Sequence, residues 1–147
     1  MSAAAAVSVA VVFVWLGMVL AISFLEAPLK FRAPGVTVRI GLGIGRLVFR
    51  ALNGVEAIFA LALVVTAAVA AGSAGSGLTA GVIIAGAVGV ATLVAQLTLV
   101  RPRLNRRSDR ILAGEDAPRS RGHLAYVGLE AVKVVALLVT GILLLAR

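Results

Sequence analysis

The chain has 147 residues, of which 61% are hydrophobic, and it carries a formal net charge of +8. Its mean hydropathy of +1.11 excludes a soluble domain, because a domain of this size cannot hide that much apolar surface. The chain has no cysteine, which excludes disulfides, thiolate catalysis and iron–sulfur clusters. Its single histidine, His123, cannot make a multi-histidine metal site or a bis-histidine haem site within one subunit, and no cofactor is predicted.

Four apolar stretches, each long enough to cross a bilayer, follow one another along the chain. They cover about residues 5–27, 47–71, 78–100 and 124–146. In hydrocarbon the backbone must satisfy its own hydrogen bonds, so each stretch is predicted to be a helix. Residues 1–147 are therefore expected to form a single all-α membrane domain of four transmembrane helices. The first stretch has no basic region before it, so we expect a retained helix and not a cleaved signal peptide.

The positive charge is concentrated between the spans. Residues 26–50 hold five of the fourteen Lys and Arg residues and residues 101–121 hold seven, whereas residues 71–77 hold none. The positive-inside rule then places both basic loops, residues 28–46 and 101–122, in the cytoplasm, with both termini outside the plasma membrane. Topology explains the arginines, so nucleic-acid binding is not expected. The second loop is a candidate for contact with anionic lipid head groups through Arg101, Arg103, Arg106 and Arg107.

The two halves of the chain match each other at a constant offset of 74 residues. Gly54–Thr66 aligns with Gly128–Thr140 with seven identities in thirteen positions, and Pro28 falls on Pro102. This pattern predicts two duplicated helical hairpins related by a pseudo-twofold axis along the membrane normal. Repeat one covers residues 1–73 and repeat two covers residues 75–147.

Proline and glycine mark the cytoplasmic ends of the spans. Pro28 and Pro102 follow the first and third stretches, where a proline can end or kink a helix. Gly41, Gly43 and Gly45 resemble a phosphate-binding glycine run, but no strand precedes them. Close backbone packing or a hinge is the expected role of this run.

Polar residues inside the spans need a reason, because each ionisable group costs about 2.5–3.5 kcal/mol on insertion. Their spacing of three and four residues indicates polar stripes along helix faces, which are expected to converge on the cytoplasmic half of the bundle interior. The first two spans supply Ser23, Glu26, Arg50, Asn53 and Glu56, and the last two supply Gln96, His123, Tyr126, Glu130 and Lys133.

Two interpretations of these stripes remain open. In the first, the glutamates pair with Lys133, Arg50 and Lys30, and the network only fixes helix register. In the second, the stripes line a cavity open to the cytoplasm, where a substrate or a proton binds and where Glu56 and Glu130 could share a proton. The sequence does not tell which of the two glutamates Lys133 neutralises.

Three aromatic or titratable residues have more ordinary expected roles. His123 is expected to cap a helix or contact head groups, Tyr126 to anchor the chain at the interface, and Trp15 to pack.

The favoured function is a small transport or binding protein with a polar intramembrane site open to the cytoplasmic side. The site is predicted to contain Glu56, Glu130, Lys133, Asn53, Gln96 and Arg50, with Glu26, Ser23, His123 and Tyr126 as additional candidates. The alternative is a structural or accessory subunit of a larger membrane complex. A third class is a membrane enzyme acting on a lipid or isoprenoid, with a glutamate pair as acid and base, but no nucleophile motif supports it. A single bundle is small for a transporter, so a homo-oligomer or a membrane-protein partner is expected.

A family resemblance rests on three short motifs. Ser23–Pro28 closes the first span, Arg101 and Pro102 close the third, and His123 opens the fourth. In this layout the chain resembles the small four-helix membrane proteins of unknown function grouped with eukaryotic transmembrane protein 205. The resemblance implies a four-span bundle and brings no established catalytic residues. The chain departs from that group in Glu26 and in its repeated Gly-x-Glu-Ala motif.

Overall fold

A computed structural model describes residues 2–72, 78–116 and 121–146, and its elements form four long helical segments without a strand in these ranges. The first segment consists of α1 (Ala3–Val19), the π-helical η1 (Leu20–Glu26), α2 (Ala27–Leu29) and the 3₁₀ turn η2 (Lys30–Arg32). The second is α3 (Val38–Ala71). The third consists of α4 (Ala80–Ala95), the π-helical η3 (Gln96–Val100) and α5 (Arg101–Leu112), and the fourth is α6 (Arg121–Leu145). All four are long and apolar enough to cross a membrane, which is consistent with an integral membrane protein.

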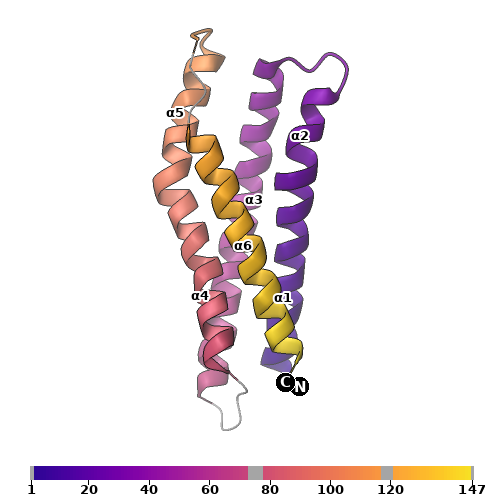
Figure 1. Cartoon of the computed structure of the whole chain (residues 1–147), viewed down its shortest axis with the longest axis vertical. Coiled ribbons are helices and arrows are strands. Elements are labelled where there is room, and N and C mark those ends of the chain that lie inside the picture. The colour runs from indigo at the N-terminus through magenta and orange to yellow at the C-terminus, as the bar shows by residue number, and fades with distance from the viewer. Residues whose placement is uncertain (1, 73–77, 117–120, 147) are drawn as a thin grey trace.

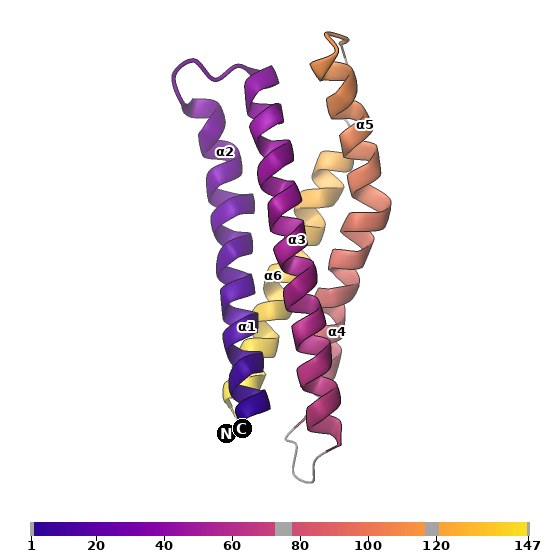
Figure 2. The ribbon, with the colours of Figure 1, turned by 180° about the vertical axis from the view of Figure 1, so that it is seen from behind.

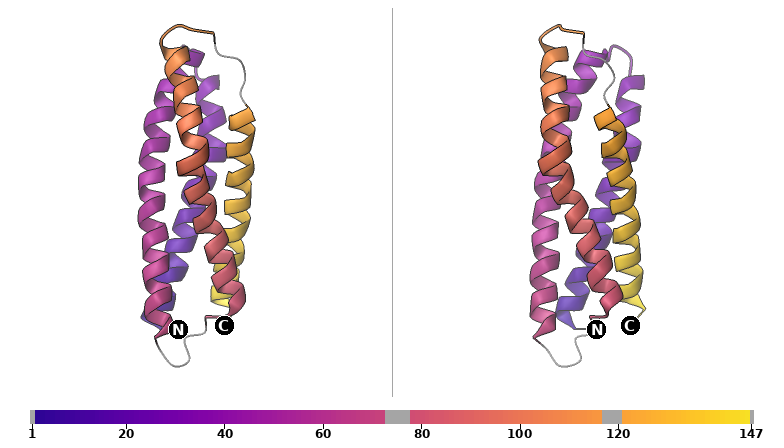
Figure 3. Two further views of the ribbon diagram at one scale, coloured as in Figure 1. Left: turned by 90° about the vertical axis from the view of Figure 1, so that its left-hand side faces the viewer. Right: turned by 60° about the vertical axis from the view of Figure 1, so that its left-hand side comes forward.

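The helices form an elongated bundle with one open side (Figure 1). α1 packs against both α3 and α6, and α6 packs along α4, whereas α3 and α4 contact each other much less. α6 crosses the bundle diagonally, from the region of α5 to the beginning of α1 (Figure 1). Seen from behind, α2, the beginning of α3 and α5 gather at one end, and the chain termini lie at the other (Figure 2). The side views in Figure 3 show the same separation of the two ends.

Hydroxyl side chains cap the first turns of three helices. Ser2 accepts a hydrogen bond from the Ala5 backbone N–H at the start of α1, at 3.2 Å. Thr37 does the same for α3 and Thr79 for α4. Each hydroxyl satisfies one of the backbone donors that a helix leaves unpaired at its beginning, which fixes where these helices start.

The helices are longer than the apolar stretches. α3 has 34 residues and the α4–α5 segment 33, so each is about 50 Å long, against about 30 Å for the hydrocarbon core. The expectation that residues 28–46 and 101–122 are loops was therefore wrong for most of both ranges. The arginine-rich sequence of α5 and the first turns of α3 continue as helix because arginine and leucine are strong helix formers. The end that holds α2, α5 and the beginning of α3 is called the basic end below.

Two π-turns let the chain pass its prolines without ending the helix. The Ala27 N–H donates to the Ile22 carbonyl, and the Arg101 N–H donates to the Gln96 carbonyl, each spanning five residues. A wider turn relieves the clash between a proline ring and the carbonyl one turn earlier. Pro28 and Pro102 then lie in the first turn of α2 and α5.

Glycines mark the closest approaches between segments. A Cβ atom on Gly41 would overlap the Phe31 ring, and one on Gly45 would lie 2.9 Å from Lys30 Nζ. Close packing was the expected role of the glycine run, and it is confirmed at these two positions. Deep in the bundle, a Cβ on Gly141 would lie 2.7 Å from Phe13 Cζ, so this glycine allows α6 to approach α1.

The apolar core lies mostly between the middle of the bundle and the terminal end. Val12, Trp15, Val19 and Leu137 are completely buried there, with contributions from all four segments. Next to this core, the described residues include a group of strongly polar side chains that is buried to the same degree.

Candidate functional site

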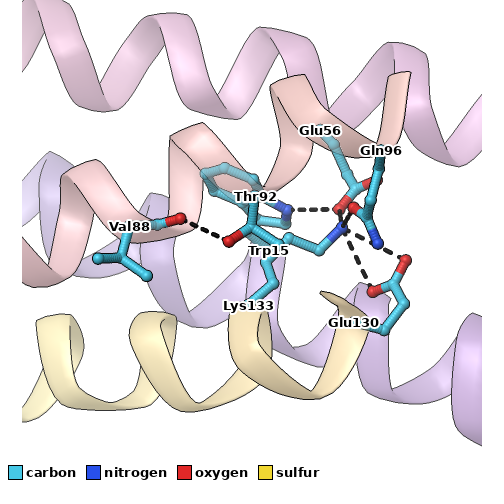
Figure 4. Close-up of polar contacts among 7 residues, drawn as sticks. All are labelled: Trp15, Glu56, Val88, Thr92, Gln96, Glu130 and Lys133. Atoms are coloured by element: carbon cyan, nitrogen blue, oxygen red, sulfur yellow. Dashed lines mark hydrogen bonds and ion pairs between the residues drawn. The ribbon is translucent and has the colours of Figure 1, made fainter. Parts of the chain in front are cut away.

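Lys133 is the centre of a buried polar group in the middle of the bundle (Figure 4). Its Nζ lies 2.5 Å from Glu56 Oε1 and 3.3 Å from each carboxylate oxygen of Glu130. It also donates a hydrogen bond to Gln96 Oε1 at 2.7 Å. One ammonium group therefore serves two carboxylates and an amide.

A tryptophan completes the group. Trp15 Nε1 donates to Glu56 Oε1 at 2.9 Å, the same oxygen that Lys133 contacts. All four helical segments thus contribute, since Trp15 lies on α1, Glu56 on α3, Gln96 on η3, and Glu130 and Lys133 on α6. These five residues are called the Lys133 cluster.

The cluster is closed and carries an unbalanced charge. Trp15, Glu56, Gln96 and Lys133 are 0% exposed, and Glu130 is 1% exposed. With all three groups ionised, two carboxylates face one ammonium, and the cluster has one excess negative charge. Burying an unpaired charge costs far more than burying a paired one, so this excess is the main electrostatic feature of the site.

Several buried polar atoms of the site lack a hydrogen-bond partner. They include Glu56 Oε2, Glu130 Oε2 and Gln96 Nε2 within the cluster. The same is true of Asn53 Oδ1 and Tyr126 Oη, which lie about one helical turn closer to the basic end. Buried polar atoms are rarely left unpaired in folded proteins, so this concentration distinguishes the site from the rest of the bundle.

Arg101 lies on the same side of the cluster, half-buried beside aromatic rings. Its guanidinium lies 5.7 Å from the centre of the Phe49 ring, within the range of a cation–π contact. Tyr126 meets Phe49 edge-on, with 5.6 Å between the ring centres. Arg101, Phe49 and Tyr126 therefore form a layer between the Lys133 cluster and the basic end.

The structure brings together most of the predicted site residues. Glu56, Glu130, Lys133 and Gln96 are in direct contact, and Asn53 is buried next to them. The open question of which glutamate Lys133 neutralises has the answer that it contacts both, with Glu56 closer.

Other predicted residues lie outside the cluster. Arg50 is exposed on the surface of α3, and His123 is exposed near the start of α6. Glu26 pairs with Lys30 one turn away, at 3.2 Å. Ser23 has a buried hydroxyl without a hydrogen-bond partner, on η1 and not in the cluster.

The structure changes the expected roles of three residues. Tyr126 is 6% exposed, so it packs inside the bundle, and the expectation that it anchors the chain at an interface was wrong. Trp15 packs in the core as expected, but it also donates to Glu56, which no sequence pattern indicated. Arg101 was assigned to a loop and instead faces the site. A search of the described ranges finds no group of three or more His, Cys, Asp and Glu side chains that could hold a metal ion.

Comparisons with known proteins give no relative for this chain. No protein-family model, curated protein or solved structure matches it significantly. The function must therefore be argued from the site itself.

Proposed function

We propose that this chain is a small membrane transport or binding protein whose Lys133 cluster takes up one proton inside the bilayer. The observation that carries the proposal is the arrangement of Glu56 and Glu130 around a single ammonium group. One proton on either carboxyl group would make the cluster neutral, and a neutral cluster costs less in hydrocarbon. Two carboxylates that share a site titrate as a pair, which suits the binding and release of one proton.

The polar layer toward the basic end supports access from that side. Asn53 and Tyr126 extend the line of polar atoms by one turn, and Arg101 follows. A site open to the cytoplasm requires this layer to move, since the cluster is closed in the structure. Gln96 begins the π-turn η3, and π-turns often occur at functional sites because their backbone can shift register.

The membrane orientation is part of the proposal. The basic residues of α3 and α5 gather at one end of the bundle, so the positive-inside rule favours a cytoplasmic basic end and external termini at the plasma membrane. Arg103, Arg106 and Arg107 on α5 are the candidates for anionic head groups. Arg101 is a weaker candidate because it stacks on Phe49.

The internal repeat also belongs here. The two π-turn hydrogen bonds, Ala27 to Ile22 and Arg101 to Gln96, are separated by the same 74 residues as the sequence match. Glu56 and Glu130 are separated by 74 residues as well, and both contact Lys133. We infer duplicated hairpins with an approximate twofold axis along the membrane normal, passing near the cluster. Superposition of residues 5–70 on 79–144 in an experimental structure tests this inference.

Infrared spectroscopy tests the proton site. The purified protein in lipid nanodiscs is titrated with acid, and the C=O band of a protonated carboxyl group is followed. We expect one buried carboxyl to titrate, and Glu130→Gln to abolish that band in a folded protein. Glu26→Gln is the matched control, because Glu26 pairs with a lysine at the basic end and should leave the band unchanged. A titration identical in the wild type and in Glu130→Gln would overturn the proposal.

A transport function needs a further measurement. Proteoliposomes with an internal pH indicator report proton movement across the membrane under an imposed potential. We expect an initial flux in the wild type that Glu56→Gln and Glu130→Gln lower at least tenfold. A site that titrates without any flux would leave a binding protein and exclude proton transport.

A structural or accessory subunit is the second candidate. The specific observation in its favour is the closure of the cluster, where Lys133 contacts three polar groups at once and can fix the register of three helices. In that case Glu130→Gln should lower thermal stability in detergent without changing any proton uptake. A homo-oligomer, a membrane-protein partner and membership of the group of transmembrane protein 205 are kept as proposals, and cross-linking in native membranes tests the first two.

A further inference from the structure

A second site candidate lies at the terminal end of the bundle, away from the Lys133 cluster. A cavity of about 380 Å³ is enclosed by α1, α3, α4 and α6 and opens between α3 and α4. Small residues create the space, in particular Ala67 on α3 and Gly86, Ala87 and Ala91 on α4. This cavity is called the α3–α4 groove.

The groove is long and narrow. Its lining on the α4 side runs from Leu78 to Ala91, which corresponds to about 20 Å along the helix axis. Dividing the volume by this length gives a mean cross-section of roughly 20 Å², a channel about 4–5 Å wide. A helix needs a width of about 10–12 Å and does not fit, whereas non-bonded carbon atoms pack about 4 Å apart, so a single hydrocarbon chain does.

The hydroxyl groups in the lining already have partners. Ser8 Oγ donates to Thr66 Oγ1 at 2.8 Å, and Thr66 Oγ1 donates to the Leu63 carbonyl at 3.0 Å. Thr140 Oγ1 donates to the Ala136 carbonyl at 2.7 Å. The groove therefore offers an apolar surface and no unsatisfied hydroxyl that selects for a polar ligand.

The surroundings of the groove decide where an occupant comes from. Val64 and Ile83, at its mouth, are exposed on membrane-spanning helices, so the mouth opens toward hydrocarbon and not toward water. The sequence at this end of the bundle contains no Asp, Glu, Lys, Arg or His in four stretches, residues 2–9, 66–72, 78–87 and 139–146. An occupant is thus held by its chain, without a charged contact to its head group.

We propose that the α3–α4 groove binds one hydrocarbon chain of a membrane lipid, with little selection for the lipid head group. This site is independent of the proton site. Buried Ala60, Leu93 and Leu137 lie between the two, and the nearest lining residue on α3, Leu63, is about 10 Å along the helix from Glu56. Either proposal can therefore fail without the other.

A pair of neighbouring alanines gives a matched test. Ala67 lines the groove, whereas Ala68 is exposed on the lipid-facing surface of the same helix turn. Ala67→Phe fills the groove, and Ala68→Phe adds the same side chain outside it. Gly86→Ala is a milder third variant, because its new Cβ would meet Leu63 and Thr140 at 3.7 and 3.9 Å, which are ordinary contacts.

Native mass spectrometry measures the occupant. The full-length protein is stripped of lipid in detergent, incubated with a phosphatidylcholine of defined chain length, and released from the micelle under increasing activation. We expect one lipid per chain to persist after the weakly bound lipids are lost. Ala67→Phe should lower its occupancy at least fivefold, Gly86→Ala by a smaller factor, and Ala68→Phe less than twofold. A phosphatidylglycerol with the same chains should bind within twofold of the phosphatidylcholine.

Three outcomes would overturn the proposal. Equal lipid retention in Ala67→Phe and Ala68→Phe would show that the bound lipid lies elsewhere. A preference of fivefold or more for phosphatidylglycerol would point to the arginines of the basic end. A change from dimer to monomer in Ala67→Phe, without loss of lipid, would show that the groove is an interface between two copies of the chain. If Ala67→Phe does not fold, unchanged occupancy in Gly86→Ala would equally contradict the proposal.

Discussion

The protein uses the same kind of ion pair in two very different environments. In the Lys133 cluster, ammonium and carboxylate groups are at most 1% exposed. At the basic end, Arg46 pairs with Asp109 between α3 and α5, with side chains that are 32% and 56% exposed. Water screens the second pair and is excluded from the first, so an identical chemical change should have a large effect in one and a small effect in the other. Burial, and not the identity of the partners, determines what such a pair contributes.

Replacing the central lysine is the largest test of this difference. Lys133→Met removes the one cation that serves Glu56 and Glu130 and leaves two buried carboxylates facing each other. We expect a loss of about 3–5 kcal/mol in the free energy of unfolding, the range typical of a broken buried pair. Unfolding by SDS in mixed micelles measures it. A loss below about 1 kcal/mol would mean that the carboxylates are already neutral.

The closer glutamate should matter second most. Glu56 accepts from Lys133 and from Trp15 through one oxygen, so Glu56→Gln weakens two contacts to a charged group. We expect a destabilisation of about 2 kcal/mol by the same assay. Trp15 is the only tryptophan in the chain, so its fluorescence emission should shift in this variant. Unchanged emission would contradict the Trp15 to Glu56 hydrogen bond.

The more distant glutamate should be cheaper to neutralise. Glu130 lies 3.3 Å from Lys133, against 2.5 Å for Glu56, and removing its charge leaves one cation with one anion. Glu130→Gln then imitates the protonated cluster, and we expect a change of about 1 kcal/mol or less. Thermal unfolding in detergent would reveal a discrepancy, because a larger loss than that of Glu56→Gln would reverse the proposed order of the two carboxylates.

The exposed pair should give the smallest effect. Asp109→Asn breaks the contact with Arg46 at the basic end, and we expect less than about 0.5 kcal/mol. The difference from the wild type should vanish in high salt, because salt screens exposed pairs and hardly affects buried ones. Measuring Asp109→Asn and Lys133→Met in parallel at low and high salt makes the comparison direct. A salt-dependent loss in Lys133→Met would show that water reaches the cluster.

The helices and the centre of the site could be predicted from the sequence. Long apolar stretches determine the spans, and the few polar residues within them need partners, which is why Glu56, Glu130, Lys133 and Gln96 could be predicted to meet. Arg50 lies outside the cluster for a geometric reason. Each residue turns an α-helix by about 100°, so two successive three-residue steps carry Arg50 about 120° away from Glu56. The stripe of residues that includes both is therefore not a single face.

Arg101 and Trp15 were missed for other reasons. Pro102 is a strong helix-end signal, and it hid the fact that the π-turn η3 continues the helix and places Arg101 one wide turn beyond Gln96. Trp15 is surrounded by apolar residues on α1, so its hydrogen bond to Glu56 depends only on how α1 packs against α3. A contact between segments 41 residues apart leaves no trace in local periodicity.

The π-turn η3 also makes the relation between the arginine-rich helix and the interior depend on chain length. A π-turn holds one more residue than an α-turn would, so it is equivalent to a single-residue insertion in an otherwise regular helix. Deleting one residue between Gln96 and Arg101 would restore α-helical spacing and rotate α5 by about 100° relative to α4. Arg101 would then leave Phe49, and Asp109 would turn away from Arg46. One residue of length therefore sets which side of α5 faces the rest of the bundle.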